Sequence, residues 1–355
     1  MTNDELQSKT INFLRFPLII GVVLIHAHIT KMTMNGIDIF QGNVFPIYDT
    51  VSFLFSDVIA RIAVPLFFFI SGFLFFYKSK GFSLSVYGRK LKKRVHSILI
   101  PYLFWNLLVL LLFFLAQTFL SGFTSGATKL IRDYSFSDWL AAFWSNIICY
   151  QFWFLRDLMV VVLFSPLVFV AVKYLRLSAV FVLGLLWYFD WWFSFTGFSI
   201  TAFFFFSLGA YLSVWRCNFI ALLKPYLFSS VVIYALLAFF CVCFKEQSWV
   251  SFICSLSILF GIVLTISLSA YFLERGKWSV NTFLVGGTFF VYAFHGMPLA
   301  LIMKFCIKYS PYLNNGILLG IYFSSTVFII LVSLGIYYLL RRWFPRSLII
   351  MTGGR

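Results

Sequence analysis

Ten apolar runs, each of about 17–25 residues, follow one another along this chain of 355 residues. A run of that length crosses the hydrocarbon core of a bilayer when it is helical. A transmembrane β-barrel would show short alternating segments instead, so we expect the spanning element to be the α-helix. The expected spans are 11–30, 58–77, 98–120, 154–172, 178–195, 199–215, 226–244, 249–272, 283–303 and 316–340.

The composition excludes a water-soluble fold. Hydrophobic residues make up 62% of the chain, charged residues only 11%, and the mean hydropathy is +0.97. A soluble fold of this size has too little polar side chain to cover so much apolar surface. We therefore predict an all-α polytopic membrane protein with about ten transmembrane helices, in which residues 1–355 form a single domain. Pro17, Pro65, Pro166 and Pro298 lie inside spans and are expected to kink them.

The basic residues orient the chain. There are 27 Lys and Arg against 11 Asp and Glu, a formal net charge of +16. If the N-terminus is cytoplasmic, 19 of the 27 basic residues fall on the cytoplasmic side and 8 on the outer side. The positive-inside rule therefore favours cytoplasmic N- and C-termini. We expect contacts with anionic membrane lipid and no nucleic-acid partner.

Two connections, 31–57 and 121–153, are too long to be turns and are expected on the outer side. Val51–Phe55 would rest at the membrane interface, and Trp139–Tyr150 suits an interfacial or re-entrant helix. The six cysteines lie mostly inside apolar runs without a CxxC pattern. They are expected to be small apolar side chains, without a disulfide framework.

Ionisable side chains inside the spans need a reason to be there, because each costs about 2.5–3.5 kcal/mol at the centre of the membrane. His26, Asp190 and His295 are the deepest. Arg15 and His26 are eleven residues apart, about 16 Å along a helix, and point in nearly the same direction. They indicate either a functional face or a snorkelling arginine beside a structural histidine. His28 lies about 200° around the helix from His26, so the two cannot share a metal ion, and no metal site is expected.

The basic segment 78–94 contains seven Lys and Arg residues, five of them within 89–94. Membrane orientation alone would place basic residues here. The density also suits a cradle for a polyphosphate such as coenzyme A. The sequence leaves both interpretations open.

Several motifs occur together and in a fixed order. They are Arg15 with His26 on the first span, Arg61 before Val64–Phe73 on the second, the basic segment that leads into Ile98–Trp105, Trp153–Leu155, and Phe290–His295. Together they resemble the integral-membrane acyltransferase-3 family, over about residues 9 to 340. The resemblance implies an enzyme that O-acylates, usually acetylates, a hydroxyl of a polysaccharide or lipid-linked glycan, with acetyl-CoA (or another acyl-CoA) as the donor. It also implies a place in the inner (plasma) membrane of a bacterium.

The resemblance also implies roles for individual residues. His26 corresponds to an essential histidine, Arg15 to its paired basic residue, and Arg61 to the basic residue before the Pro-Phe-Phe stretch. Arg89, Lys90, Lys93 and Arg94 stand in for the family's Arg-x-x-Arg pattern and are the candidates to bind the donor phosphates. His295 is either a second catalytic residue or a structural histidine between helices.

A neutral imidazole at His26 could take the proton of the attacking hydroxyl while Arg15 or Arg61 stabilises the tetrahedral intermediate. Asp57 and Asp190 are the candidates to orient His26. An acyl-histidine relay is an alternative. The competing functions are a transporter or flippase for a glycolipid or polysaccharide precursor, and a non-catalytic sensor or assembly component. The motif set favours the acyltransferase, and the oligomeric state stays open.

Overall fold

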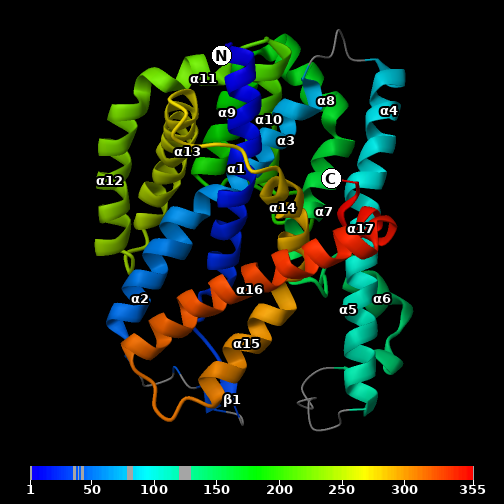
Figure 1. Ribbon diagram of the computed structural model, residues 1–355. Coiled ribbons are helices and arrows are strands. Elements are labelled where there is room, and N and C mark those ends of the chain that lie inside the picture. The colour runs from blue at the N-terminus through cyan, green and yellow to red at the C-terminus, as the bar shows by residue number, and fades with distance from the viewer. Residues whose placement is uncertain are drawn as a thin grey trace.

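The structure, a computed structural model, describes residues 2–34, 37–38, 40, 44–77, 83–119 and 129–354. Within these ranges the chain is a bundle of helices, and the only strands are the two-residue antiparallel pair β1 (Thr33–Met34) and β2 (Ile37–Asp38) (Figure 1). The all-α prediction is therefore confirmed. Lys78, Lys80 and residues 35–36, 39, 41–43 and 120–128 of the two long connections lie outside the described residues.

Each of the ten predicted runs contains helix. In chain order the described helical segments are α1 (Asn3–Ala27), α2 (Pro46–Phe53), η1 (Leu54–Ile59), η2 (Ala60–Ile62), α3 (Ala63–Phe76), α4 (Leu84–Arg94), η3 (Val95–Leu99), α5 (Ile100–Phe119), η5 (Ile131–Asp133), α6 (Phe136–Phe143), η6 (Tyr150–Phe152), α7 (Trp153–Leu163), α8 (Ser165–Val170), η7 (Ala171–Leu175), α9 (Leu177–Tyr188), α10 (Ile200–Val214), α11 (Phe219–Leu223), η8 (Lys224–Tyr226), α12 (Leu227–Cys243), α13 (Val250–Glu274), α14 (Thr282–Phe294), α15 (Gly296–Lys308), α16 (Asn315–Trp343) and α17 (Pro345–Thr352).

Six helical segments of the described chain are long and apolar enough to cross a bilayer, and two bent pairs raise this number to eight. The pairs bend by 61° between α7 and α8 and by 65° between α14 and α15. The helices α9 and α10, with 12 and 15 residues, are shorter. The chain is an integral membrane protein, while the count of ten spans and the side of the termini stay predictions.

Some boundaries differ from those expected. The second span begins at Pro46 and runs without interruption to Phe76, so Val51–Phe55 belongs to it and is not a separate interfacial segment. Pro46 is the first residue of α2, where a proline's missing N–H costs nothing, and the chain contains no further proline before Pro65.

The Trp139–Tyr150 segment also folds differently, because the helix there is only α6 (Phe136–Phe143). Ser135 and Asp138 form a capping box that starts it early. Pro166 and Pro298 lie in the first turn of the second helix of each bent pair, whereas α1 continues through Pro17.

The helix α1 lies inside the bundle and packs against α3, α13, α14 and α16 (Figure 1). Beside it, α3 and α10 cross at very short range. A Cβ atom on Gly72 of α3 would lie 2.0 Å from the carbonyl oxygen of Phe206, and one on Gly209 of α10 would lie 2.0 Å from that of Phe69. Only glycine allows this reciprocal approach, as expected for Gly72 from the sequence.

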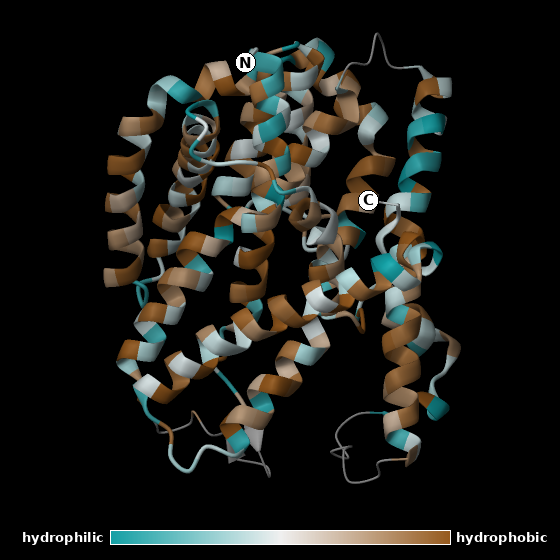
Figure 2. Cartoon of the chain, viewed as in Figure 1, coloured by the Kyte–Doolittle hydropathy of each residue, from teal (hydrophilic) through white to brown (hydrophobic). Residues whose placement is uncertain are grey.

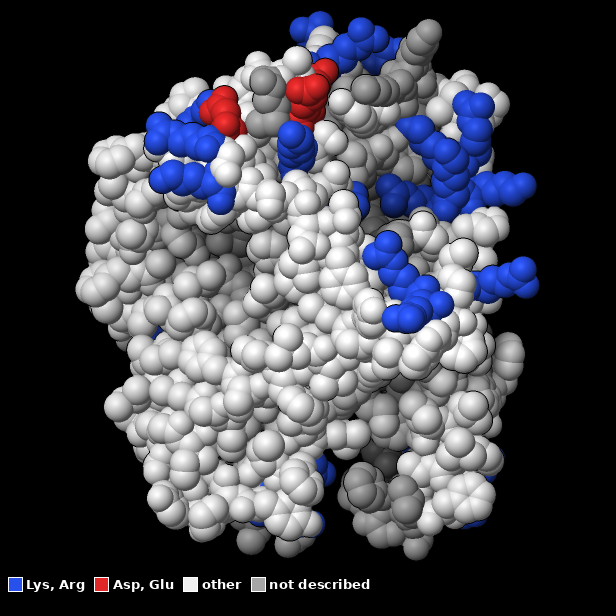
Figure 3. Space-filling model, viewed as in Figure 1, with Lys and Arg blue, Asp and Glu red and all other residues white. Residues whose placement is uncertain are grey.

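Hydrophobic residues cover most of the helices, and hydrophilic residues gather at the start of α1 and along α4 (Figure 2). On the face shown in Figure 3, Lys and Arg lie mainly at the end of the molecule that carries the N-terminus and α4. Where α12 ends and α13 begins, Cys241 of α12 and Cys254 of α13 form a disulfide, with Cα atoms 5.7 Å apart. The expectation that all cysteines are unpaired was therefore wrong for these two, because the α12–α13 hairpin brings them face to face.

Candidate active site

A cavity of about 710 Å³ lies inside the bundle. Its wall is formed by α1, η2, α3, the last residue of α4, the segment from η6 into α7, and side chains from α9, α10, α13 and α14. Four residues singled out from the sequence line it: Arg15, His26, Arg61 and Arg94. The fold thus gathers residues of three separate segments around one space.

Arg15 and His26 both face this cavity from α1, which is the shared face that their spacing predicts. Eleven residues of helix separate them by about 16 Å. Between them, Ile19, Val22 and Ile25 complete the α1 wall. The cavity therefore has a cationic region, an apolar stretch and an imidazole in sequence along one helix.

Arg15 and Arg94 supply positive charge to the wall without a counter-charge. Within the described residues, neither guanidinium has a carboxylate within 4.0 Å, and the guanidinium of Arg94 lies 5.8 Å from the ring centre of Phe75. Both arginines are partly buried, and a cation withdrawn from water without an anion is costly. This part of the cavity is therefore suited to an anionic ligand.

The other three basic candidates lie elsewhere on α4. Lys90 donates to the carbonyl oxygen of Phe75, with its ammonium 5.0 Å from the ring centre of that residue. Arg89 and Lys93 are exposed, and none of the three lines the cavity. Of the four candidates for the donor phosphates, the structure brings only Arg94 to the cavity.

His26 lies in the last turn of α1, and its ring is close to two rings from other elements. The ring centre of Tyr150 on η6 lies 5.0 Å away in an edge-on arrangement, and that of His295 lies 5.3 Å away. His295 is fully buried between α14 and α15, does not line the cavity, and its Nδ1 donates to the carbonyl oxygen of Val291 at 3.1 Å. The two histidines, 269 positions apart in the sequence, are neighbours in the structure.

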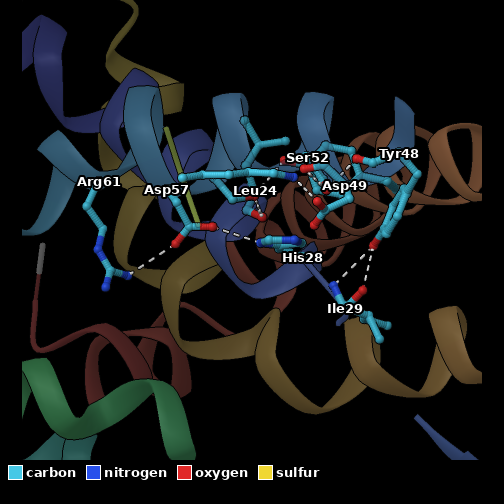
Figure 4. A network of polar contacts seen from close by, with 11 residues as sticks. Leu24, His28, Ile29, Tyr48, Asp49, Ser52, Asp57 and Arg61 are labelled. Carbon is cyan, nitrogen blue, oxygen red and sulfur yellow. Dashed lines mark hydrogen bonds and ion pairs between the residues drawn. The ribbon is translucent and has the colours of Figure 1, made fainter. Parts of the chain in front are cut away.

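Asp57 does not orient His26. Its carboxylate accepts a hydrogen bond from Nδ1 of His28 at 2.8 Å and pairs with Arg61 at 3.8 Å (Figure 4). Asp190, the other carboxylate considered, is exposed beyond the end of α9 with a φ of 53°. The sequence could have indicated the Asp57–Arg61 pair, since the two residues are one helical turn apart, but not the contact with His28.

The end of α1 that carries His26 is held by the second span (Figure 4). Ser56 donates to the carbonyl oxygen of Leu24 at 2.8 Å, and the hydroxyl of Tyr48 bonds both backbone groups of Ile29. The backbone is thus fixed on both sides of His26.

Sequence reasoning missed Tyr150 and Gln151. Gln151 is buried, lines the cavity, and donates to the carbonyl oxygen of Ala293 at 3.0 Å. The only sequence signal was a polar pair directly before the Phe152–Leu155 run. Across the described residues, no group of three or more His, Cys, Asp or Glu side chains could hold a metal ion.

Comparisons with known proteins identify the family of the chain. The model of the acyltransferase-3 family, described as an acyltransferase domain, matches residues 8–340. The succinoglycan biosynthesis protein ExoH of Rhizobium meliloti is 29% identical over 188 residues, which cover 52% of this chain and 48% of that protein. The match thus spans about half the length of that relative. No solved structure matches the chain.

Proposed function

The chain belongs to the acyltransferase-3 family, and on that premise we propose that it moves an acyl group, expected to be acetyl, from acyl-CoA to a hydroxyl of a cell-surface or lipid-linked glycan. One observation carries the proposal. One cavity of about 710 Å³ is lined by an imidazole, His26, and by two arginines, Arg15 and Arg94, that have no carboxylate within 4.0 Å among the described residues.

The cavity suits an acyl-CoA in size and chemistry. Its volume falls in the range of ligand pockets. The phosphates of the donor would pair with Arg15 and Arg94, since a guanidinium group binds phosphate through two parallel hydrogen bonds. The uncharged arm of the donor would follow the apolar wall of α1 toward His26.

The chemistry at His26 balances without a further reactant. The acceptor hydroxyl oxygen attacks the thioester carbonyl carbon while the imidazole takes the hydroxyl proton. Arg61, which lines the same cavity, stabilises the negative oxygen of the tetrahedral intermediate. The carbon–sulfur bond then breaks, and the imidazolium returns its proton to the leaving thiolate, which gives an ester and free CoA thiol.

The proposed glycan acceptor is supported by the relative, whose name assigns it to succinoglycan biosynthesis. We further propose that the protein lies in the inner membrane of a bacterium. Aromatic residues beside the site, such as Tyr150, suit contact with a sugar ring.

The test is release of free thiol from acetyl-CoA by the purified chain in lipid nanodiscs. Lipid-linked glycans extracted from membranes of the expressing cells serve as acceptor, and radiolabelled acetyl is followed into the glycan. Substituting His26→Gln should lower the rate at least about 100-fold, because general-base catalysis contributes on that order. His96→Gln is the matched control, because His96 is exposed on η3 and outside the cavity lining. Unchanged transfer by the His26 variant would remove the proposal.

A transporter or flippase is the second candidate, because discontinuous helices such as α14–α15 are frequent in transporters. It predicts movement of a glycolipid across the nanodisc or vesicle membrane without thiol release. The thiol assay separates the two functions in a single measurement.

A further inference from the structure

Resting on the proposed function, we propose that His295 is a positioning residue: when the substrates are bound, its Nε2 accepts a hydrogen bond from His26, which fixes the orientation of that imidazole and stabilises the imidazolium formed during acyl transfer. The argument begins with the state of the His295 ring. A carbonyl oxygen can only accept, so the bond from Nδ1 to Val291 places the ring hydrogen on Nδ1. In the neutral ring, Nε2 is then an acceptor.

That acceptor is buried, and among the described residues it has no partner. Nε2 of His295 is enclosed by protein and makes no hydrogen bond with any part of the chain that the structure describes. A buried polar atom left unpaired is destabilising, so it calls for an explanation. His26, the neighbouring ring, also makes no hydrogen bond with any described residue.

The distance between the rings suits a direct bond. In an imidazole pair joined through nitrogen atoms, the centres lie about 5 Å apart, because the nitrogens are about 3 Å from each other. The observed centres are 5.3 Å apart. Catalytic hydrogen bonds are often long before substrate binds and shorten in the reacting complex.

His295 is held in place by the break in its own helix. The carbonyls around the α14–α15 bend each accept from a side chain of the site: that of Val291 from His295, that of Ala293 from Gln151, and that of Gly296 from Tyr150. A Cβ atom on Gly296 would lie 2.3 Å from the side-chain oxygen of Gln151. The bend therefore does not leave these carbonyls unpaired, and it fixes His295 against His26.

The arrangement assigns the two nitrogens of His26 to different tasks. The nitrogen that donates to His295 carries the hydrogen in the resting ring, so the other nitrogen is the base available to the acceptor hydroxyl. When the ring becomes an imidazolium, its bond to Nε2 of His295 strengthens, since hydrogen bonds from charged donors are stronger. The titratable or charged groups around His26 are His295, Tyr150 on η6 and Arg61 on η2.

The test compares His295→Leu, which removes the acceptor, with His295→Gln, whose side-chain oxygen can replace Nε2. Acetyl transfer from acetyl-CoA to the extracted lipid-linked glycans is measured in nanodiscs from pH 5 to pH 9. We expect His295→Leu to lower kcat about 100-fold with the KM for acetyl-CoA within about three-fold of the wild-type value. We expect His295→Gln to recover at least about one tenth of the wild-type kcat. The acidic limb of the kcat profile should move to lower pH in His295→Leu, because the imidazolium of His26 loses its acceptor.

The outcomes are distinguishable. Equal activity of the two variants, or an unmoved acidic limb in a correctly inserted His295→Leu protein, would overturn the inference while the acyltransferase stands. Absence of thiol release by the wild-type protein would instead refute the proposed function. His96→Leu controls for loss of a histidine, and size-exclusion elution in detergent shows which variants are folded.

Discussion

Three arginines line the same cavity, but only one of them has a counter-charge. Arg61 pairs with Asp57, which also accepts a hydrogen bond from His28. Arg15 and Arg94 have no carboxylate partner among the described residues. Since an isolated charge inside a protein is costly unless it is paired, the difference indicates two tasks. Under the proposed function, Arg61 would be held in position for the reaction by Asp57, and Arg15 and Arg94 would bind an anionic donor.

The largest kinetic effect in this comparison is expected from the two arginines without a counter-charge, Arg15 and Arg94. Arg94→Gln should raise the KM for acetyl-CoA about 10- to 100-fold with little change in kcat, because a hydrogen bond to a charged group contributes about 1.5–3 kcal/mol. Steady-state kinetics of thiol release measure this. Arg89→Gln is the control on the same helix, since Arg89 is exposed and outside the cavity lining. An equal KM increase in both variants would mean that α4 acts only through its overall charge.

A donor without phosphates sharpens the same comparison. S-acetylpantetheine keeps the thioester but lacks the nucleotide phosphates, so the wild-type protein should use it less efficiently than acetyl-CoA. In Arg94→Gln this preference should shrink about ten-fold, because the contact that discriminates has been removed. The ratio of kcat/KM for the two donors is the measurement. A ratio that stays unchanged in the variant would place the phosphates away from Arg94.

Changes to the Asp57–Arg61 pair should lower kcat. Asp57→Asn keeps the shape of the side chain but removes the charge that holds Arg61 and His28. We expect kcat to fall about five- to ten-fold with an unchanged KM for acetyl-CoA, since orientation is lost but the donor site is not. Asp133→Asn, which affects only the exposed pair with Arg132, is the matched control. A rise in KM without a change in kcat would mean that the Asp57–Arg61 pair serves donor binding and not the chemical step.

The sequence predicted the elements that depend on local pattern. Runs of apolar residues located the helices, and the spacing of Arg15 and His26 predicted that both would lie on one face of the first span, the face that lines the cavity. These predictions succeeded because helical periodicity is a local property of the chain. Gly72 was recognised for the same reason, as a small residue at a position where helices approach.

The parts that depend on tertiary packing could not be read from the sequence. The packing of η1 against the end of α1 decides which carboxylate contacts which basic side chain. As a result, Asp57 contacts His28 and not His26. A kink at Pro298 was expected, but the sequence did not show that the helix would break at His295, between Phe294 of α14 and Gly296 of α15, because a proline is compatible with a straight start, a kink or a break. Tyr150 and Gln151 gain their roles only from the carbonyls that this bend exposes.

The smallest effect is expected from a balanced pair far from the cavity, which shows what an ordinary surface pair contributes. Hydrogen bonds from Lys129 and Ser135 lower the pKa of Asp138, at the start of α6, to about 2. Because the folded-state pKa is lowered, the contribution of this carboxylate to the stability of α6 is complete above the ordinary aspartate pKa and is lost as the pH falls through about 2.

Between pH 5 and pH 8, the stability of α6 in Asp138→Asn should therefore differ from that in the wild type by a constant amount, with transfer activity within about two-fold. Hydrogen exchange of the α6 amides, corrected for intrinsic rates, should show faster opening of the helix in the variant across this range. A pH-dependent difference there, or an activity loss comparable with that of Asp57→Asn, would mean that α6 communicates with the cavity and that counter-charge alone does not separate the two kinds of site.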